Sequence, residues 1–303
     1  MKRRSPLQAS KNSLIYGGLV AAGAVGRTLS LPAARRIGRG LGAMSNTVVR
    51  RERAKALRNL AIGFPDEDQA VREEIAREMF VHLGVSLMEI CWMQNLDAAM
   101  FERTTVVEGA EHMRAALAGG KGVVLFTGHC GNWEWMAASI GMLGFPMNVI
   151  ARDLYDARLN EFVVRARAHH GIKSIGRGST SSAREMLQTL RSNEILGVLI
   201  DQSIVAENAD IDFFGRPAPT PVGPARLAIK AGAAAICGFI ERSGDLQRIR
   251  FEAPVFTAKS DDPVELTQQL TSSIEAQIRR VPSQWVWMHD RWRRRKEKAG
   301  ADK

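Results

Sequence analysis

A repeated alternation of short apolar runs with helical patterns constrains the fold of this chain more than any other feature. From residue 106 onward, five apolar runs of strand length follow one another, and segments with helical spacing lie between them. Parallel strands need crossover connections, which are usually helices, and this alternation is the pattern that such a fold leaves in a sequence. We therefore expect an α/β domain whose central mixed sheet is flanked by helices.

The expected elements can be placed by residue number. The strands are predicted at 123–126, 147–150, 195–200, 235–240 and 248–251. The helices between and after them are predicted near 111–118, 132–142, 158–169, 181–192, 224–231 and 263–280. An earlier helix, predicted at 69–93, is amphipathic in its first half and almost wholly apolar in its second. It reads either as a core helix or as the wall of an apolar channel or a membrane contact.

The basic charge of the chain is concentrated at its two ends. Residues 1–60 hold 13 Lys or Arg and the single acid Glu52, and residues 291–303 hold 7 basic residues and 2 acids. Residues 61–290 hold 22 basic and 29 acidic residues. We predict a basic N-terminal region, 1–60, and one α/β domain, 61–303, with a basic tail. Such ends suit an anionic membrane or nucleic acid, although charged runs are also common as solvated surface.

The N-terminal region combines its charge with apolar residues. The nearly uncharged run 13–26 has 14 residues, which is short of the ~20 that span a bilayer. A cleaved signal peptide shares the basic start and the short apolar core. The basic amphipathic stretch 29–58 that follows is more typical of a helix lying on a membrane surface. We therefore expect a helical membrane-anchoring extension that rests on the membrane or enters it shallowly.

The segment GKGVVLFTGHCGNWEW, residues 120–135, carries the clearest chemical signal. An apolar strand ends at Thr127, and a helix is predicted to begin near Asn132. His129 therefore falls in a strand-to-helix turn at the carboxyl edge of the sheet, where α/β proteins bind ligands. Gly128 flanks it and leaves space for a substrate. Glu134 follows His129 by five residues, and that spacing can return its carboxylate to the imidazole.

A histidine held by a carboxylate on one ring nitrogen becomes a better base at the other. Such a base can deprotonate an alcohol as the alcohol attacks a thioester. On spacing alone, an isolated His-x₄-Glu is more often a packing or capping arrangement. Cys130 is not expected to act as a nucleophile, because adjacent side chains diverge in a turn. Cys91, Cys130 and Cys237 are scattered, which indicates free thiols, and His169–His170 has no third ligand at metal spacing, so we expect no metal.

Four blocks in order carry a resemblance to a known family. HCGNWE at 129–134 resembles the His-x₄-Asp/Glu motif of the lysophospholipid and glycerolipid acyltransferase superfamily. LGVLIDQS at 196–203, DFFGRPAPTPVGPARLA at 212–228 and PSQWVWMHDRW at 282–292 resemble further blocks of its lipid A biosynthesis branch, the late lauroyl and myristoyl acyltransferases.

That resemblance implies a glycerolipid acyltransferase-like fold and an acyl transfer from acyl carrier protein or acyl-CoA to a hydroxyl of an anionic membrane lipid, foremost a lipid A precursor. It implies His129 as the base and Glu134 as its orienting partner. It also implies a place at the cytoplasmic face of the cell inner membrane. We expect no cofactor, no metal and no nucleic-acid partner.

Other residues are candidates for substrate binding. An arginine after the motif is expected to contact the anionic substrate, and Arg152, Arg165 and Arg167 are the candidates, each of which can also be an ordinary surface charge. Asp201 ends an apolar strand at the predicted edge of the sheet, where it can position a substrate group or simply cap a turn. Three further candidates are Asn132, Gly215 and Gly223. The two glycines would bring backbone amides to the acyl donor or to the developing oxyanion.

Several alternatives remain open. The acceptor can be a lysophospholipid, an aminolipid or another glycolipid. A thioesterase or lipase would use water as the acceptor, although the chain has no Gly-x-Ser-x-Gly motif. A non-catalytic membrane-binding or nucleic-acid-binding protein would use only the basic ends. Trp285, Trp287 and Trp292 suit a membrane interface, but the first two can equally share one buried face.

Overall fold

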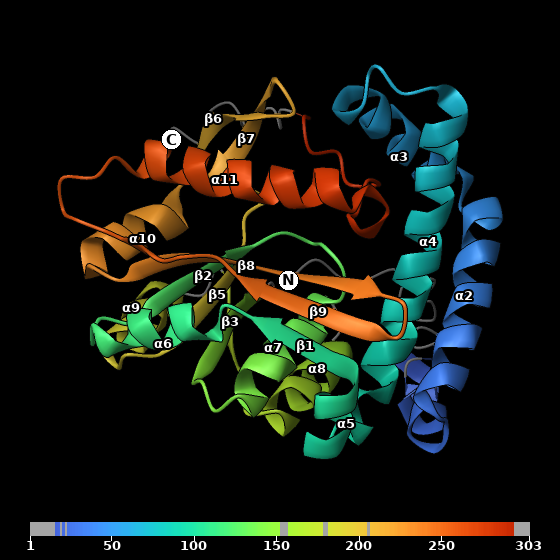
Figure 1. The fold of residues 1–303 in the computed structure, drawn as a ribbon, viewed down its shortest axis with the longest axis horizontal. Coiled ribbons are helices and arrows are strands. Elements are labelled where there is room, and N and C mark those ends of the chain that lie inside the picture. The colour runs from blue at the N-terminus through green and yellow to red at the C-terminus, as the bar shows by residue number, and fades with distance from the viewer. Residues whose placement is uncertain are drawn as a thin grey trace, which may run out of the picture.

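The computed structural model describes residues 16–18, 20–21, 23–151, 157–177, 181–204 and 207–293. Figure 1 shows a central sheet with helices above and below it, and a pair of long helices standing at one side. The candidate Arg152 and most of the basic C-terminal tail lie outside the described residues.

The central sheet is mixed. Its strands are β1 (Thr105–Glu108), β2 (Val123–Thr127), β3 (Met147–Ala151), β4 (Lys173–Gly176), β5 (Ile195–Leu199), β8 (Ala234–Ser243), β9 (Leu246–Phe251) and β10 (Val255–Phe256). They are ordered β1-β9-β8-β2-β5-β3-β4, with β10 paired to β8. Strands β2, β3, β4 and β5 pair in parallel, whereas β8 is antiparallel to β9 and β10. A separate hairpin consists of β6 (Asn208–Phe213) and β7 (Arg216–Pro221).

The core lies on both faces of this sheet because β2 is apolar along its whole length and buried throughout. Val124 and Phe126 point into one cluster of buried side chains, and Val123 and Leu125 point into another. This alternation is the two-residue periodicity of a strand covered on both sides.

Helices cover the two faces and one side of the sheet. They are α2 (Leu31–Val48), α3 (Arg50–Gly63), α4 (Gln69–Trp92), α5 (Ala98–Thr104), α6 (Ala110–Ala118), α7 (Trp133–Met142), α8 (Ala157–His169), α9 (Ser182–Arg191), α10 (Gly223–Ala231) and α11 (Pro263–Arg280), with 3₁₀ turns at Met93–Asn95 and Pro282–Gln284. Residues of α10 and α11 join the cluster around Phe126, and residues of α6 and α7 join the cluster around Leu125.

The expected α/β architecture with a mixed central sheet is confirmed. All five predicted strands are present, as β2, β3, β5, β8 and β9, and each predicted helix has its counterpart. The strands β1, β4, β6, β7 and β10 were not predicted. They are short or partly exposed, and β7 carries Pro217, Pro219 and Pro221, so their sequences lack the continuous apolar run of a buried strand.

Two long helices, α2 and α4, pack closely at one side of the sheet (Figure 1). A Cβ atom on Gly84 would lie 2.3 Å from the carbonyl oxygen of Gly38, and one on Gly42 would lie 2.3 Å from that of Phe80. Glycine therefore allows the two backbones to approach. Helix α4 buries Met88 and Trp92 among its core side chains, which confirms the core-helix interpretation.

The expected membrane anchor is not supported as a spanning helix. Within the part of the chain that the structure describes, no helix has the length and apolar character needed to cross a membrane. The apolar run 13–26 falls partly outside that part.

Candidate active site

The loop that carries His129 joins β2 to α7. Its glycines are required by close contacts: a Cβ atom on Gly131, whose φ is +57°, would lie 2.4 Å from the carbonyl oxygen of Ile240. One on Gly128 would lie 3.2 Å from the Asp201 carboxylate. The loop is thus pressed between β8 and the end of β5, with His129 at the carboxyl edge of the sheet, as the sequence predicts.

The carboxylate that holds the His129 ring is Asp201. His129 Nδ1 lies 2.8 Å from Asp201 Oδ1, and the His129 backbone amide donates to Asp201 Oδ2 at 2.7 Å. The sheet explains the pairing, because the parallel register of β2 and β5 aligns Thr127 with Leu199. Each functional residue follows its aligned strand residue by two positions, so the two side chains meet just beyond the strands.

Asp201 is almost fully buried, at 1% exposed. Burial raises the pKa of its carboxyl, but the charge and hydrogen bonds of His129 and the Trp285 indole outweigh it and lower the pKa to about 2. An ionised carboxylate only accepts hydrogen bonds, so His129 Nδ1 carries the proton. His129 itself is 23% exposed and lines a pocket, which leaves Nε2 as the nitrogen that can take a proton there.

Glu134 has a different partner from the one expected. Its carboxylate receives two hydrogen bonds from Arg167 of α8, Nε to Oε2 at 2.9 Å and Nη2 to Oε1 at 2.5 Å. Helix α7 begins at Trp133, and this turn places the Trp133 ring, not Glu134, against the imidazole, with centroids 4.9 Å apart. The predicted Glu134–His129 contact is therefore replaced by the Asp201–His129 contact.

A cavity of about 770 Å³ opens beside His129. Glu134 and Arg167, each about 15% exposed, also line it. Its buried lining is mostly apolar and includes Leu125, Met136, Met147 and Leu196. Its exposed lining includes Arg177, Arg226 and Lys230. The pocket therefore joins an apolar interior to a basic opening, with His129 at its wall and Asp201 buried behind His129.

The remaining candidates divide between this pocket and other places. Among the described residues, the pocket lining includes Gly223, at the start of α10, but neither Arg165 nor Gly215. Arg165 is exposed and pairs with Glu161 on its own helix. Gly215 lies in the β6–β7 turn, where its amide donates to Asp212.

Asn132 is also outside the pocket and is only 1% exposed. Its Oδ1 accepts from the Trp135 amide at 3.1 Å and so caps α7, while its Nδ2 donates to Glu89 of α4 at 2.9 Å. The expected contact of Asn132 with substrate does not fit this placement, since both ends of the amide are already used inside the protein.

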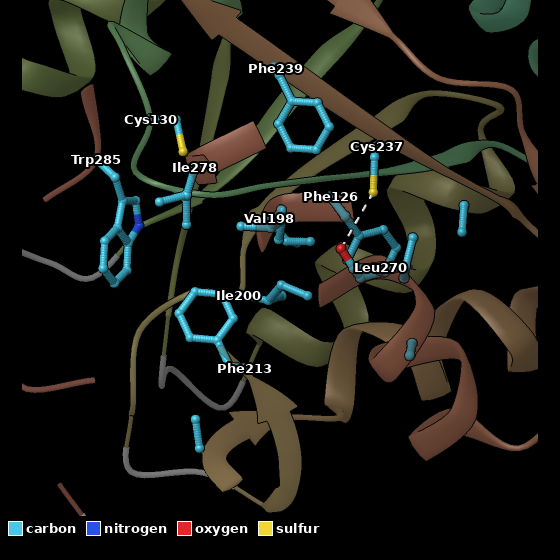
Figure 2. Close-up of a cluster of buried hydrophobic side chains, with 14 of the residues drawn as sticks. Phe126, Cys130, Val198, Ile200, Phe213, Cys237, Phe239, Leu270, Ile278 and Trp285 are labelled. Atoms are coloured by element: carbon cyan, nitrogen blue, oxygen red, sulfur yellow. Dashed lines mark hydrogen bonds between the residues drawn. The ribbon is translucent and has the colours of Figure 1, made fainter. Parts of the chain in front are cut away.

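Trp285 is a site residue for which the sequence suggested a membrane interface or a buried face, but no contact with the candidate base or its partner. Its indole Nε1 donates to Asp201 Oδ2 at 2.7 Å, and it is 1% exposed. Figure 2 shows it beside Cys130 and Phe213 in a buried cluster. Trp285 and Trp287 are both buried, so the alternative of one shared interior face is confirmed for them. Their two-residue spacing was the available signal.

Cys130 is an interior packing group. It is 2% exposed, and burial and the nearby Asp201 charge raise the pKa of its thiol well above the usual value. Cys91 and Cys237 are likewise free and buried. A thiol that stays protonated is a poor nucleophile. Cys130 instead belongs to the buried cluster that includes Trp285, and its backbone forms a β-bridge with Trp285.

The chain resembles known proteins over most of its length. A family model described as bacterial lipid A biosynthesis acyltransferase matches residues 5–294. A phosphatidylinositol mannoside acyltransferase of Mycobacterium tuberculosis (strain CDC 1551 / Oshkosh) is 28% identical over 192 residues, 62% of this chain and 60% of that protein. The matched region thus spans about three fifths of that relative.

Two relatives from Escherichia coli (strain K12) match more of the chain. The lipid A biosynthesis palmitoleoyltransferase is 26% identical over 263 residues, 86% of this chain and 84% of that protein. The lipid A biosynthesis lauroyltransferase is 23% identical over 275 residues, 89% of this chain and 88% of that protein. The match of the family model to nearly the whole chain shows that this protein belongs to the bacterial lipid A biosynthesis acyltransferase family.

Proposed function

We propose that this protein transfers a fatty acyl group from a thioester to a hydroxyl of an anionic glycolipid. The observation that carries the proposal is the His129–Asp201 pair, joined at 2.8 Å, whose His129 lines a pocket with an apolar interior. A base held in one tautomer beside an apolar cavity suits an alcohol attacking a fatty acyl ester or thioester.

The reaction proceeds in two proton transfers. His129 Nε2 takes the proton of the acceptor hydroxyl while the hydroxyl oxygen bonds to the thioester carbonyl carbon. The tetrahedral intermediate then expels the thiolate as the carbon–sulfur bond breaks, and the imidazolium returns its proton to the sulfur. Asp201 keeps Nδ1 protonated and stabilises the imidazolium, as the acid of a hydrolase triad does. General-base assistance of this kind contributes about 10²–10⁴-fold in rate.

The pocket provides for both ends of an acyl donor. Its buried apolar side chains, among them Met136, Met147 and Leu196, suit a hydrocarbon chain. The exposed cations Arg177 and Lys230, which also line the pocket, suit the phosphorylated arm of acyl carrier protein or acyl-CoA. Arg226, beside them, pairs with Glu207 at 2.6 Å. Either donor suits this arrangement.

For the acceptor we propose a lipid A precursor, with another phosphorylated glycolipid as the alternative. The relatives support both, since their names specify lipid A in Escherichia coli and phosphatidylinositol mannoside in Mycobacterium tuberculosis. Arg167 and Glu134 form the polar pair on the wall that His129 shares. We propose that this pair binds the sugar hydroxyls or phosphate of the acceptor, which gives Glu134 a role in substrate binding and makes Asp201 the partner of the base.

Helix α2 supports a place on the membrane surface, for which we propose the cytoplasmic face of the inner membrane. Ile37, Leu41, Met44 and Val48 follow a helical spacing and are 38–69% exposed. The opposite side of α2 is buried against α4, and exposed arginines such as Arg36 flank the apolar stripe. An apolar stripe between cations is the pattern of a helix that lies in an anionic interface.

The chemical proposal is tested by lipid mass spectrometry of cells with the intact protein, with its His129→Ala variant and without it. We expect a glycolipid that gains one acyl chain only with the intact protein. A gain that persists in His129→Ala would contradict the base assignment. Release of free fatty acid without any acylated lipid would instead identify a hydrolase.

The membrane proposal is tested by sedimentation with vesicles that contain one third phosphatidylglycerol. The Leu41→Glu/Met44→Glu variant is expected to stay in the supernatant, since it places two charges on the apolar stripe. Phe256→Glu is the matched control, because Phe256 is 66% exposed on β10 and belongs to no such stripe. Equal binding by both variants would refute the role of α2.

A further inference from the structure

The carboxylate of Glu89 lies deep inside the protein and outside the proposed chemistry. It is 0% exposed in the second half of α4, at a point where α2, β8, β9 and the loop after β2 converge. Leaving a carboxylate ionised in such a place is costly unless it is fully hydrogen-bonded. Burial raises the pKa of Glu89, but Arg242 and Arg35 outweigh this and lower it.

Side chains from four elements donate to this carboxylate. Arg35 Nε of α2 lies 2.8 Å from Oε1, and Arg242 Nη2 of β8 lies 2.7 Å from Oε2. Gln247 Nε2 of β9 lies 3.0 and 2.9 Å from the two oxygens. Asn132 Nδ2 completes the set at 2.9 Å. All of these groups are donors, so only an acceptor with two ionised oxygens satisfies them together.

The bond to Asn132 has a direct consequence for the loop that carries His129. A carboxylate cannot donate, so Glu89 fixes the amide of Asn132 with its nitrogen inward. The oxygen then faces the Trp135 amide and caps α7 at 3.1 Å. Asn132 follows His129 by three residues, and its orientation therefore determines how the loop enters the helix.

A second connection runs from Glu89 to the same loop through Arg242. The side-chain amide of Gln284 pairs with the backbone of Arg242 in both directions, at 2.8 and 2.9 Å. The backbone carbonyl oxygen of Gln284 accepts a hydrogen bond from the Gly131 backbone amide at 2.8 Å. Of two consecutive loop residues, Asn132 is thus bound by Glu89 directly. Gly131 is connected to Glu89 through Gln284 and Arg242, whose backbone holds Gln284 and whose guanidinium binds the carboxylate.

We propose that Glu89 is a positioning residue for the acyl transfer, holding the His129 loop in its reactive geometry through Asn132 and through Arg242 and Gln284. This inference rests on the proposed function. It assigns the ion cluster a role beyond stability, because a buried ion pair adds little net stability compared with apolar residues of the same volume. A displacement of about 1 Å in a catalytic group can cost about 10²-fold in rate.

The test uses the full-length protein with an acyl thioester and a glycolipid acceptor, and measures kcat, the acceptor KM and the melting temperature. Asn132→Asp retains an oxygen to cap α7 but turns the donor into an acceptor that faces Glu89. We expect kcat to fall about 10²-fold with the acceptor KM unchanged. Glu89→Gln is expected to act similarly. The double variant Glu89→Gln/Asn132→Asp is expected to recover at least tenfold over Asn132→Asp, since the amide introduced at position 89 can donate to the new carboxylate.

Gln247→Leu is the control, because it removes a donor from Glu89 without touching the loop. We expect it to lower the melting temperature while kcat stays near the wild-type value. If Asn132→Asp lowers the melting temperature but keeps kcat, as Gln247→Leu does, then Glu89 is only structural and the proposal is wrong. Asn132→Asp retains Glu89 itself, so this comparison holds even if Glu89→Gln fails to fold.

A measurement independent of turnover separates this inference from the proposed function. The Cε1 proton signal of His129, assigned by its loss in His129→Ala, is expected to shift or broaden in Asn132→Asp and to stay unchanged in Gln247→Leu. Those changes in a protein that acylates no lipid would support the positioning role and reject the function. An active wild type whose Asn132→Asp variant changes neither kcat nor this signal would reject the positioning role alone.

Discussion

Two buried carboxylates, Asp201 and Glu89, each accept hydrogen bonds from the loop that carries His129, and they differ in their other partners. Both are at most 1% exposed and fully used as acceptors. Asp201 receives hydrogen bonds from an imidazole, a backbone amide and an indole. Glu89 receives them from two guanidinium groups and two side-chain amides. The same chemical group thus lies in two different electrostatic environments.

The difference explains what each carboxylate can do. Among the groups that hydrogen-bond to Asp201, only the imidazole of His129 takes up a proton in the proposed reaction, so the negative charge of Asp201 acts on the base. The charge of Glu89 is matched by arginines that remain cationic at every working pH. Glu89 therefore fixes geometry, while Asp201 fixes geometry and stabilises a charge that appears during the reaction.

The largest effect is expected from Asp201→Asn. The amide can still bond to the backbone and to His129, but it can no longer hold Nδ1 protonated or stabilise the imidazolium. We expect kcat to fall about 10²–10⁴-fold, in line with the loss of general-base catalysis. The measurement is acyl transfer from a labelled thioester to a glycolipid, with the fold checked by circular dichroism.

Glu89→Gln serves as the comparison for Asp201→Asn. It removes the other buried charge and is expected to lower kcat about 10²-fold together with a large fall in melting temperature. Equal losses of kcat and equal losses of melting temperature in the two variants would remove the distinction between the carboxylates.

The next largest effect is expected at the Glu134–Arg167 pair. The Glu134 carboxylate is paired with a guanidinium, as Glu89 is, but it is partly exposed. Arg167→Lys keeps the charge but loses the two-pronged hydrogen bond. We expect the acceptor KM to rise about 10- to 100-fold, the range of a lost charge-assisted hydrogen bond, with a smaller change in kcat. Arg165→Lys on the same helix is the control, since Arg165 lies outside the pocket. A change in kcat alone would assign Arg167 to the chemical step.

The sequence predicted the position of His129 but not its partner. A strand ending before a glycine-flanked histidine is a local pattern, readable within 120–135. The partner Asp201 is 72 residues away and is brought in by the adjacency of β2 and β5, which no local pattern specifies. Asp201 was expected at the sheet edge, but its contact with the imidazole depends on strand order.

Glu89 shows the same limit more sharply. In the sequence it is the one acid in the apolar helical stretch 80–93, which also holds His82 and Ser86. Its role depends on donors from α2, β8 and β9 that lie far away in the chain. The alternation of strands and helices predicted the layers of the fold, because burial periodicity is local. The polar contacts that cross between layers were not predictable in that way.

The pH dependence of stability distinguishes the surroundings of Glu89, where His82 lies, from those of Asp201. Burial and the Arg242 charge lower the pKa of His82 to about 4 from its ordinary 6.5, and its Nδ1 accepts from Arg242 at 2.9 Å. The folded protein then binds fewer protons than the unfolded chain between pH 4 and 6.5, so stability falls as pH falls through this window. The loss is on the order of 2–3 kcal/mol. The Asp201 pKa of about 2 puts its own loss below pH 4.

Urea unfolding at a series of pH values measures this difference. His82→Asn retains an acceptor for Arg242 without a titrating ring, and it is expected to flatten the profile between pH 6.5 and 4. Asp201→Asn is expected to leave that slope intact and to change the profile only at lower pH. A wild-type profile that is flat between pH 6.5 and 4 would show that burial and Arg242 do not keep His82 neutral.

The smallest effect is expected from a change in the packing of α2 against α4, which brings Arg35 to Glu89. Gly42→Ala would place a Cβ atom 2.3 Å from the backbone oxygen of Phe80, so α2 must move away from α4. Overpacking of this kind costs about 1–3 kcal/mol. Gly40→Ala on the exposed side of α2 meets nothing within 4 Å and is expected to stabilise the helix by up to about 1 kcal/mol.

The pair of glycine variants also tests whether the two carboxylates are separable. A shift of α2 weakens the Arg35–Glu89 bond, whereas the strands that align His129 with Asp201 are untouched. Gly42→Ala should therefore lower the melting temperature and reduce kcat modestly, without altering the pH dependence of kcat that the His129–Asp201 pair sets. If that pH dependence shifts as well, the environment of Asp201 depends on α2, and the two carboxylates act as one coupled unit.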